Sequence, residues 1–274
     1  MGRFRFIKMH GLGNDFVVID ARVERQEITA ARARAIADRH RGVGCDQLIL
    51  LDPPPPGAKG VAATMRIFNP DGSEAEACGN ASRCVATLLP AGARIATRGG
   101  ELAAEIVAAG VTITLPPPRF DAASVHLAYP ADTAPLPMAW GDLADGWTVD
   151  VGNPHIVFTV PDADAVPLAT LGPEVEHDAI FTRGINVGVA EVTGPSTLKL
   201  RVWERGAGVT QACGTGACAA AVVAIRRRLV ASPVEVTLPG GTLTIDWAGG
   251  DAPIRMTGPA TRVFDGEADW AAFA

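Results

Sequence analysis

Alternating apolar and polar residues predict several β-strands. Residues 111–115 (VTITL), 234–238 (VEVTL) and 243–247 (LTIDW) alternate with a period of two, which is typical of strands that bury one face. Residues 238–242 (LPGGT) contain the Pro and Gly residues of a turn between the last two strands. Strand signals dominate the pattern, and the chain is therefore predicted to be rich in β-sheet.

Helical patterns are fewer. They predict helices over residues 29–40, after Cys78 and after Cys213. Residues 217–225 are apolar on every helical face and are followed by three arginines, so we expect this helix to be buried on all sides. Residues 52–57 (DPPPPG) are interpreted as a surface loop, with a recognition segment as the alternative.

Echoes at a nearly constant offset indicate an internal duplication. Residues 13–18 match 152–157. Residues 66–68 match 201–203, and residues 77–79 match 212–214. Residues 99–100 match 240–241, and residues 113–118 match 254–259. We therefore predict two similar halves, each a β-rich shell around a central helix, divided near the prolines after Leu115. We place the halves at residues 1–117 and 118–261, and leave open that the tail 262–274 packs on the first half.

Composition excludes several classes of protein. The 274 residues include 48 % hydrophobic and 20 % charged residues, which is not the composition of a disordered chain. The formal net charge is −6 and the longest basic run is Arg226–Arg228, so we expect no nucleic-acid partner. The longest uncharged apolar run, residues 217–225, is shorter than the roughly 18 to 20 residues of a membrane-spanning helix. Small anionic or zwitterionic molecules remain as partners.

The cysteines and lysines point to a reduced, cofactor-free protein. The cysteines are odd in number, form no C-x-x-C pair and are too sparse for a disulfide scaffold. Together with an N-terminus that lacks an apolar signal region, they favour a cytoplasmic chain. Only Lys8, Lys59 and Lys199 are available as lysines, which leaves few candidates for a Schiff base with pyridoxal phosphate.

Cys78 and Cys213 stand before Gly at two predicted helix starts. The positive end of a helix dipole can lower a thiol pKa from about 8.5 to roughly 3.5–7.5, so either thiol is a candidate base near neutral pH. Backbone N–H groups at Gly79-Asn80 and Gly214-Thr215 are suited to bind a carboxylate. If the duplication brings the turns face to face, one thiolate can remove an α-proton while the opposite thiol delivers another, with inversion of configuration.

Other interpretations of these residues are weaker. A lone buried cysteine is more often a packing residue than a catalytic one, and we interpret Cys45, Cys84 and Cys218 in that way. The G-x-G-x-x-A pattern of residues 214–219 resembles a dinucleotide fingerprint, but the preceding residues 206–211 do not form the buried strand that this motif requires. The histidines are dispersed, and we expect no metal.

The motifs taken together resemble the cofactor-independent diaminopimelate epimerases over essentially the whole chain. The resemblance implies interconversion of LL- and meso-2,6-diaminopimelate, in the pathway to lysine and the bacterial cell wall. It also implies an α+β fold of two pseudo-symmetric domains with barrel-like sheets, with the active site in the cleft between them, and it leaves a homodimer open. The matching segments are 10–16 (HGLGNDF), 44–47 (GCDQ), 68–73 (FNPDGS), 78–80 (CGN), 152–155 (GNPH), 185–187 (INV), 204–208 (ERGAG) and 212–217 (ACGTGA).

The resemblance assigns roles position by position. It makes Cys78 and Cys213 the acid/base pair and places the reacting carboxylate on the backbone at Gly79-Asn80 and Gly214-Thr215. Positions that hold the amino and carboxylate groups of the substrate are occupied by Asn14, Asn69, Asn153, Asn186, Glu204 and Arg205, with Gln47 and His155 in support. The chemistry of the residue types agrees, because an arginine can bind a carboxylate through two N–H groups and a glutamate suits an ammonium group.

Two departures and two alternatives remain. The family commonly has Gly where this chain has Ala81, which matters only if that position needs a positive φ. It commonly has Ala where this chain has Cys45, an additional thiol. The alternative functions are a proline or hydroxyproline racemase-like enzyme, and a non-catalytic thiol-switch protein that binds a small molecule.

Overall fold

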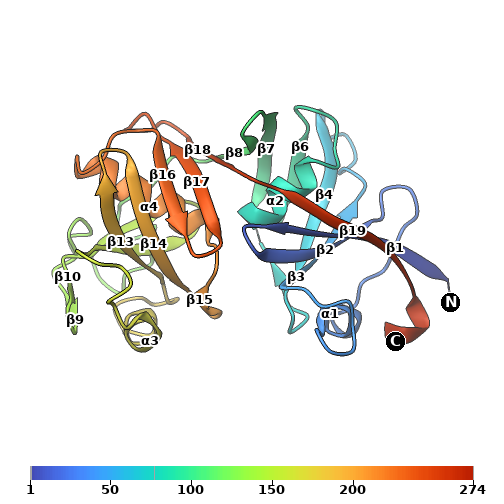
Figure 1. Cartoon of the computed structure of the whole chain (residues 1–274), viewed down its shortest axis with the longest axis horizontal. Helices are drawn as coiled ribbons and strands as arrows, with labels where there is room; N and C mark the ends of the chain where they lie inside the picture. The colour runs from blue at the N-terminus through green and yellow to red at the C-terminus, as the bar shows by residue number, and fades with distance from the viewer. Residues whose placement is uncertain (1, 77, 274) are drawn as a thin grey trace. The chain divides into compact units, whose positions relative to one another are not determined.

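The chain forms two compact units. A computed structural model describes residues 2–76 and 78–273 (Figure 1). Unit 1 contains Met1–Ile113 and Gly258–Ala274, and unit 2 contains Thr114–Thr257. The sequence places the boundaries between the halves after residues 117 and 261, whereas the structure divides the units after residues 113 and 257. Met1, Ala77 and Ala274 lie outside the described residues, and so does the first residue of the echo at 77–79.

Unit 1 is a mixed sheet. Its strands pair in the order β7, β6, β4, β3, β2, β1, β19, with β5 on β4; the pairs β2–β3 and β4–β6 are parallel and the others antiparallel. The strands are β1 (Arg3–Gly11), β2 (Asn14–Asp20), β3 (Gln47–Asp52), β4 (Val61–Phe68), β5 (Glu74–Ala75), β6 (Arg94–Thr97), β7 (Gly100–Val107), β8 (Gly110–Leu115) and β19 (Thr261–Asp269), and the last two residues of β8 belong to unit 2. The helices are α1 (Ala30–Ala37), α2 (Gly79–Ala86) and the 3₁₀ helix η1 (Trp270–Phe273).

Unit 2 has a sheet of the same kind. Its strands pair in the order β11, β12, β13, β14, β16, β17, β18, with β15 on β14; β12–β13 and β14–β16 are parallel and the others antiparallel. The strands are β11 (Trp147–Asp150), β12 (Pro154–Thr159), β13 (Asn186–Gly194), β14 (Thr197–Glu204), β15 (Gly208–Thr210), β16 (Val234–Leu238), β17 (Gly241–Asp246) and β18 (Ile254–Gly258). The helices are α3 (Leu168–Glu176) and α4 (Gly214–Arg226), and β9 (Ala139–Trp140) pairs with β10 (Leu143–Ala144).

The two units share their topology. Strands β1 to β7 follow one another and pair as β11 to β17 do, and α1 and α2 occupy the places of α3 and α4. Even the register agrees, because Phe16 pairs with Gln47 and the residues 139 further along, His155 and Asn186, pair with each other. The predicted duplication into two pseudo-symmetric α+β domains is therefore confirmed.

A buried helix forms the centre of each unit. Residues 217–224 of α4 are all buried, as expected from their uniformly apolar sequence, and the helix contacts β11, β12, β13, β14, β16 and β17. In unit 1, α2 contacts β1, β2 and β7, and its residues 80–86 are all buried. The helix ahead of each central helix, α1 or α3, packs in a separate apolar cluster. The cysteines at the helix starts are therefore held by the core itself.

Some elements differ from the sequence prediction. Helix α1 is shorter than residues 29–40, with Thr29 as its N-cap, and β17 ends at Asp246. Helix α3 was not predicted, because Gly172 and Pro173 lie inside it and both disfavour a helix. Gly172 is needed there, since a Cβ would lie 2.5 Å from the ring of Trp203.

No helix within residues 2–76 and 78–273 is long and apolar enough to cross a membrane.

Candidate active site

Cys78 caps the central helix of unit 1. It is the N-cap of α2, where its Sγ accepts a hydrogen bond from Ala81 N at 3.5 Å and its carbonyl accepts one from Ser82 N at 2.9 Å. Ala81 is a buried helical residue with an ordinary φ, and the departure from the family's Gly is therefore harmless.

Cys213 caps the central helix of unit 2 in the same way. Its Sγ accepts from Gly216 N at 3.3 Å and its carbonyl accepts from Ala217 N at 3.0 Å. Here the glycine is required, because a Cβ on Gly216 would lie 2.9 Å from Val202 Cγ2 and 3.2 Å from Cys213 Sγ. Each sulfur binds the N–H of the third helical residue, which is the hydrogen bond of an N-cap side chain.

The environment of Cys213 opposes ionisation. The residue is 4 % exposed, and burial, followed by the negative charge of Glu204, raises the pKa of its thiol well above the usual value. Hydrogen bonds from Thr215 and Gly216 act in the opposite direction but do not prevail. The expectation of a lowered thiol pKa at this helix start is therefore wrong for Cys213, because desolvation outweighs the helix terminus.

The remaining cysteines behave as packing residues. Cys45 and Cys84 are buried, and burial raises their pKa values to about 11 and about 12. Cys218 is buried inside α4. None of the five cysteines forms a disulfide.

A chain of amides lies beside Cys78. Asn14, at the start of β2, donates through Nδ2 to Asp46 Oδ2 at 2.9 Å and accepts through Oδ1 from Asn80 Nδ2 at 3.2 Å. The same Oδ1 is 4.0 Å from Cys78 Sγ. The predicted residues Asn14 and Asn80 are thus brought together with the thiol.

A second pair of predicted residues in unit 1 lies at adjacent strand ends. Gln47, the first residue of β3, donates to Asn69 Oδ1 at 3.0 Å, and Asn69 Nδ2 donates to Ser73 Oγ at 3.1 Å. Among the described residues, the buried Oε1 of Gln47 has no hydrogen-bond partner.

His155 links the polar groups around Cys213. Its Nε2 lies 3.1 Å from Asn153 Oδ1 and 3.0 Å from Thr215 Oγ1, and that hydroxyl lies 3.6 Å from Cys213 Sγ. Burial, with a smaller contribution from the charge of Arg205, lowers the pKa of His155 to about 3, so the ring is neutral at pH 7. Its Nδ1 is buried without a hydrogen-bond partner among the described residues.

The loop that carries Glu204 and Arg205 is fixed by its backbone. Asn186 Oδ1 accepts from Arg205 N at 3.0 Å, and Asn186 Nδ2 donates to Pro154 O at 2.8 Å. The carboxylate of Glu204 accepts from the Thr210 hydroxyl, and the guanidinium of Arg205 donates to Arg183 O at 3.0 Å. Asn186, at the start of β13, therefore binds the backbone of Arg205 directly after Glu204, the last residue of β14.

Comparisons with known proteins decide the family. The family model described as diaminopimelate epimerase matches residues 6–119 and 147–263. The chain is 60 % identical over 269 residues to the diaminopimelate epimerase of Sphingopyxis alaskensis, covering 98 % of both chains. It is 60 % identical over 271 residues to that of Rhizorhabdus wittichii, covering 98 % of this chain and 97 % of the relative. The chain belongs to the diaminopimelate epimerase family. It is thus an isomerase.

Solved structures of other enzymes share the fold of this family member. A phenazine biosynthesis protein of the PhzF family from Bacillus anthracis matches with a TM-score of 0.70 at 16 % identity, covering 98 % of this chain and 99 % of that one. A hydroxyproline epimerase from Agrobacterium vitis matches with a TM-score of 0.66 at 17 % identity, covering 98 % and 91 %. At these identities the likeness shows the two-domain fold alone.

Several polar residues that contact the candidate site residues were not predicted from the sequence. Arg83 is fully buried and binds Asn80, Asp46 binds Asn14, and the Glu176 carboxylate accepts from Trp203 Nε1 at 2.6 Å and from Gly206 N at 3.0 Å. A signal was present for Arg83, because a lone arginine three positions after Asn80 lies on the same helical face.

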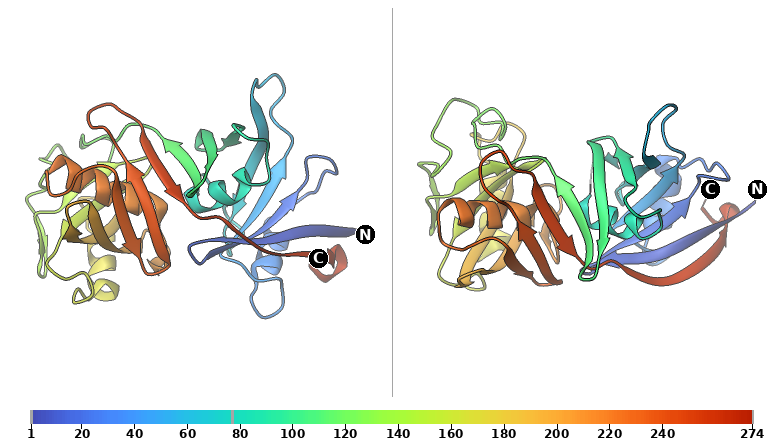
Figure 2. Two further views of the ribbon diagram at one scale, coloured as in Figure 1. Left: turned by 45° about the horizontal axis from the view of Figure 1, so that its top comes forward. Right: turned by 90° about the horizontal axis from the view of Figure 1, so that it is seen from above.

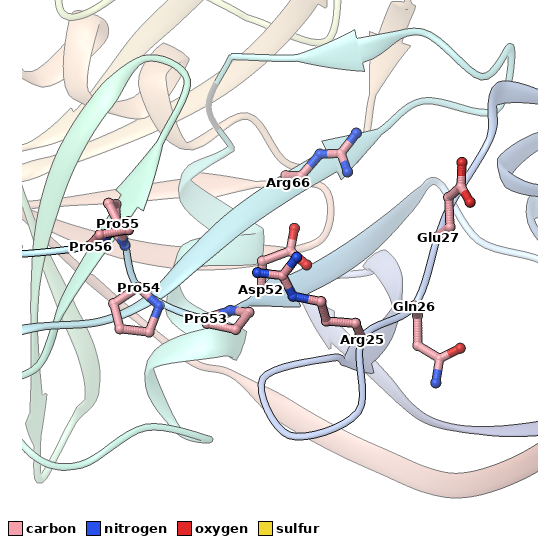
Figure 3. Close-up of a pocket in the computed structure, with 9 residues that line it drawn as sticks. All are labelled: Arg25, Gln26, Glu27, Asp52, Pro53, Pro54, Pro55, Pro56 and Arg66. Atoms are coloured by element: carbon pink, nitrogen blue, oxygen red, sulfur yellow. The ribbon is translucent and has the colours of Figure 1, made fainter.

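Two pockets of unit 1 are lined by residues other than the cysteine turns. One, of about 680 Å³, is lined by the Pro53–Pro56 run, Asp52, Arg66 and residues 25–27 (Figure 3). The other, of about 380 Å³, is lined by Lys8, His10, Gly13, Asp15, Arg39, Val263 and Phe264. The proline run is an exposed loop, as expected. Within residues 2–76 and 78–273, no cluster of three His, Cys, Asp or Glu side chains could hold a metal ion.

Proposed function

We propose that this family member interconverts LL- and meso-2,6-diaminopimelate without a cofactor, with Cys78 and Cys213 as the acid/base pair. The observation that carries the proposal is that both cysteines are N-caps of equivalent central helices, 135 residues apart in a duplicated fold. One thiolate removes the α-proton from one face of the substrate carbon, and the opposite thiol delivers a proton to the other face. The negative charge that develops on the substrate is stabilised by donors already in place.

The reacting carboxylate is proposed to bind the backbone N–H groups of Gly79-Asn80 and Gly214-Thr215, where two helix starts favour an anion. Arg205 is suited to the distal carboxylate and Glu204 to an ammonium group. Asn14, Asn69, Asn153 and Asn186 are proposed to bind the other amino and carboxylate groups.

Two buried atoms support a polar substrate. Gln47 Oε1 and His155 Nδ1 have no hydrogen-bond partner among the described residues, and such atoms are expensive to bury unless a ligand satisfies them. Gln47 is the first residue of β3, and His155 is the second residue of β12. We therefore assign Gln47 and His155 supporting roles in binding.

Two further assignments follow from the same proposal. The activity would belong to lysine and peptidoglycan-precursor biosynthesis, and cysteines that form no disulfide fit a reducing cytoplasm.

We also propose a homodimer, because Val263 and Phe264 of β19 expose 54 % and 48 % of their surfaces. Sedimentation of the unaltered protein and of the Phe264→Glu variant tests this assembly. We expect the unaltered protein to be a dimer and the variant to be a monomer. An unaltered protein that stays monomeric at high concentration would contradict the proposal.

The function is tested by adding LL-2,6-diaminopimelate to purified protein in deuterated water without any cofactor. We expect meso product whose first molecules carry deuterium at the inverted carbon, while the remaining LL substrate stays largely unlabelled at first. Equal early labelling of substrate and product would indicate a single base. Absence of any α-proton exchange would instead leave a binding protein, and turnover of proline or hydroxyproline in its place would favour the racemase-like alternative.

A further inference from the structure

Arg83 is the largest fully buried side chain of the described residues, and its partners define it. From α2 its Nη2 donates to Asn80 Oδ1 at 2.8 Å and its Nε donates to Pro259 O at 3.2 Å. Gly11 of β1 leaves room for it, since a Cβ there would lie 3.1 Å from Arg83 Nη2. A guanidinium group has only donors, so the amide atom of Asn80 that faces it must be the oxygen.

The orientation of Asn80 then determines that of Asn14. With its oxygen on Arg83, Asn80 directs Nδ2 toward Asn14 and donates to Asn14 Oδ1 at 3.2 Å. At the other end, Asn14 Nδ2 donates to a carboxylate oxygen of Asp46, whose second oxygen binds Arg39 at 2.6 Å. Two amides are thus aligned in series between a group that only donates and a group that only accepts.

This alignment has a consequence at Cys78. It turns the oxygen of Asn14, and not its NH₂ group, toward Sγ at 4.0 Å. An amide oxygen accepts from a thiol S–H, whereas the NH₂ group of a flipped amide would donate to the sulfur. The contact therefore distinguishes the two protonation states between which Cys78 must alternate in the proposed reaction.

We propose that Arg83 is a positioning residue of the epimerase, which fixes the amides of Asn80 and Asn14 so that Asn14 presents its oxygen to the Cys78 thiol. The proposal rests on the proposed function only for its kinetic consequence. Unit 2 has no equivalent of this buried arginine and its amide, since Thr215 and Cys218 stand at the positions 135 residues after Asn80 and Arg83. Arg83 thus sets the environment of one thiol and not of the other.

Three variants of the full chain separate positioning from folding. Arg83→Met removes the donor. Asn80→Asp keeps an acceptor for Arg83, so the buried guanidinium stays paired, but removes the donor to Asn14. Arg201→Met is the control, because it deletes a second arginine that binds carbonyl oxygens, those of Ala163 and Val166 at 2.9 Å, although Arg201 is only partly buried. For the first two variants we expect kcat per folded molecule to fall about tenfold and KM to change less than threefold; Arg201→Met should alter neither.

Side-chain amide signals in NMR spectra provide a readout that does not depend on activity. We expect hydrogen exchange of the Asn80 and Asn14 NH₂ groups to accelerate at least fivefold together in Arg83→Met and to stay unchanged in Arg201→Met. Normal kcat in folded Arg83→Met and Asn80→Asp, or faster exchange at Asn80 without a change at Asn14, would overturn the proposal. If the unaltered protein does not epimerise diaminopimelate, the proposed function fails, and the exchange rates still decide whether Arg83 orders the two amides.

Discussion

The two cysteine turns have the same backbone and different surroundings. In both units the cysteine is an N-cap whose sulfur accepts from the third helical residue, and strands of matched topology lead to it. Cys78 is half-buried beside an amide oxygen, whereas Cys213 is buried beside a hydroxyl group, with Glu204 raising the pKa of its thiol. At the position equivalent to Glu204, unit 1 has the neutral Asn69.

This difference shows what the duplication retained. The N-cap geometry survived in both copies because it is built from backbone atoms and a small side chain. The charges and hydrogen bonds around it diverged, and unlike surroundings suit a reaction in which one sulfur must start as a thiolate while the other starts as a thiol.

Removing either sulfur should have the largest effect. Cys78→Ala and Cys213→Ala should each lower kcat for epimerisation by about 10²–10⁴-fold or more, since each removes one of the two proposed proton-transfer groups. The measurement is the rate of meso-diaminopimelate formation. Cys218→Ala, in the same helix as Cys213, is the matched control and should retain kcat; retention of most activity by either first variant would refute the two-base assignment.

Exchanging the residues at the third helical position should expose a difference in packing. Gly216→Ala places a Cβ 2.9 Å from Val202 Cγ2 and should lower the free energy of unfolding by about 1–3 kcal/mol, as overpacked cores do. The reverse change, Ala81→Gly, should lower it by about 0.5–1 kcal/mol, because glycine disfavours a helix. Denaturant unfolding measures both free energies. A larger loss of stability for Ala81→Gly than for Gly216→Ala would contradict the expected difference in packing.

His155 should make stability depend on pH in a way that its counterpart Phe16 does not. Since burial lowers its folded-state pKa from 6.5 to about 3, the unfolded chain binds a proton between these values and the folded protein does not. The free energy of unfolding therefore decreases as pH falls below 6.5. His155→Phe should reduce this slope by up to about 1.4 kcal/mol per pH unit, measured by denaturant unfolding between pH 6.5 and 5. The same slope in this variant as in the unaltered protein would show that His155 is not held neutral; the exposed His177 provides the control substitution His177→Gln.

Neutralising Glu204 should produce the smallest effect. Its charge is the second cause, after burial, of the raised Cys213 pKa, so Glu204→Gln should increase the thiolate fraction. We expect alkylation of Cys213 by iodoacetamide at pH 8, in the absence of substrate, to accelerate about threefold to tenfold, which corresponds to a fall in pKa of up to one unit. Peptide mapping measures the rate. Glu191→Gln, elsewhere in unit 2, should not change the alkylation rate of Cys213. An unchanged rate in Glu204→Gln would show that the charge of Glu204 does not contribute to the raised Cys213 pKa.

The sequence predicted the features that local patterns control. Alternation predicted strands β8, β16 and β17, uniform apolarity predicted the buried α4, and the repeated Cys-Gly predicted two matched helix starts. It did not predict α3, where Gly172 is needed because the ring of Trp203 packs against it. It also gave the wrong direction for the Cys213 pKa, because burial depends on residues far along the chain. The role of Arg83 was not predicted, since unit 2 has no equivalent arginine that would mark it as part of the duplicated site.

Unit 1 is discontinuous, which has a consequence for synthesis. Its last strand, β19, pairs along β1 over Arg3–His10, and both views in Figure 2 show the C-terminal strand beside the N-terminal one. All of unit 2 lies between them in the chain. A ribosome therefore completes the residues of unit 2 while β1 has β2 beside it but still lacks β19, and the first part of the protein to be translated is the last that can finish folding.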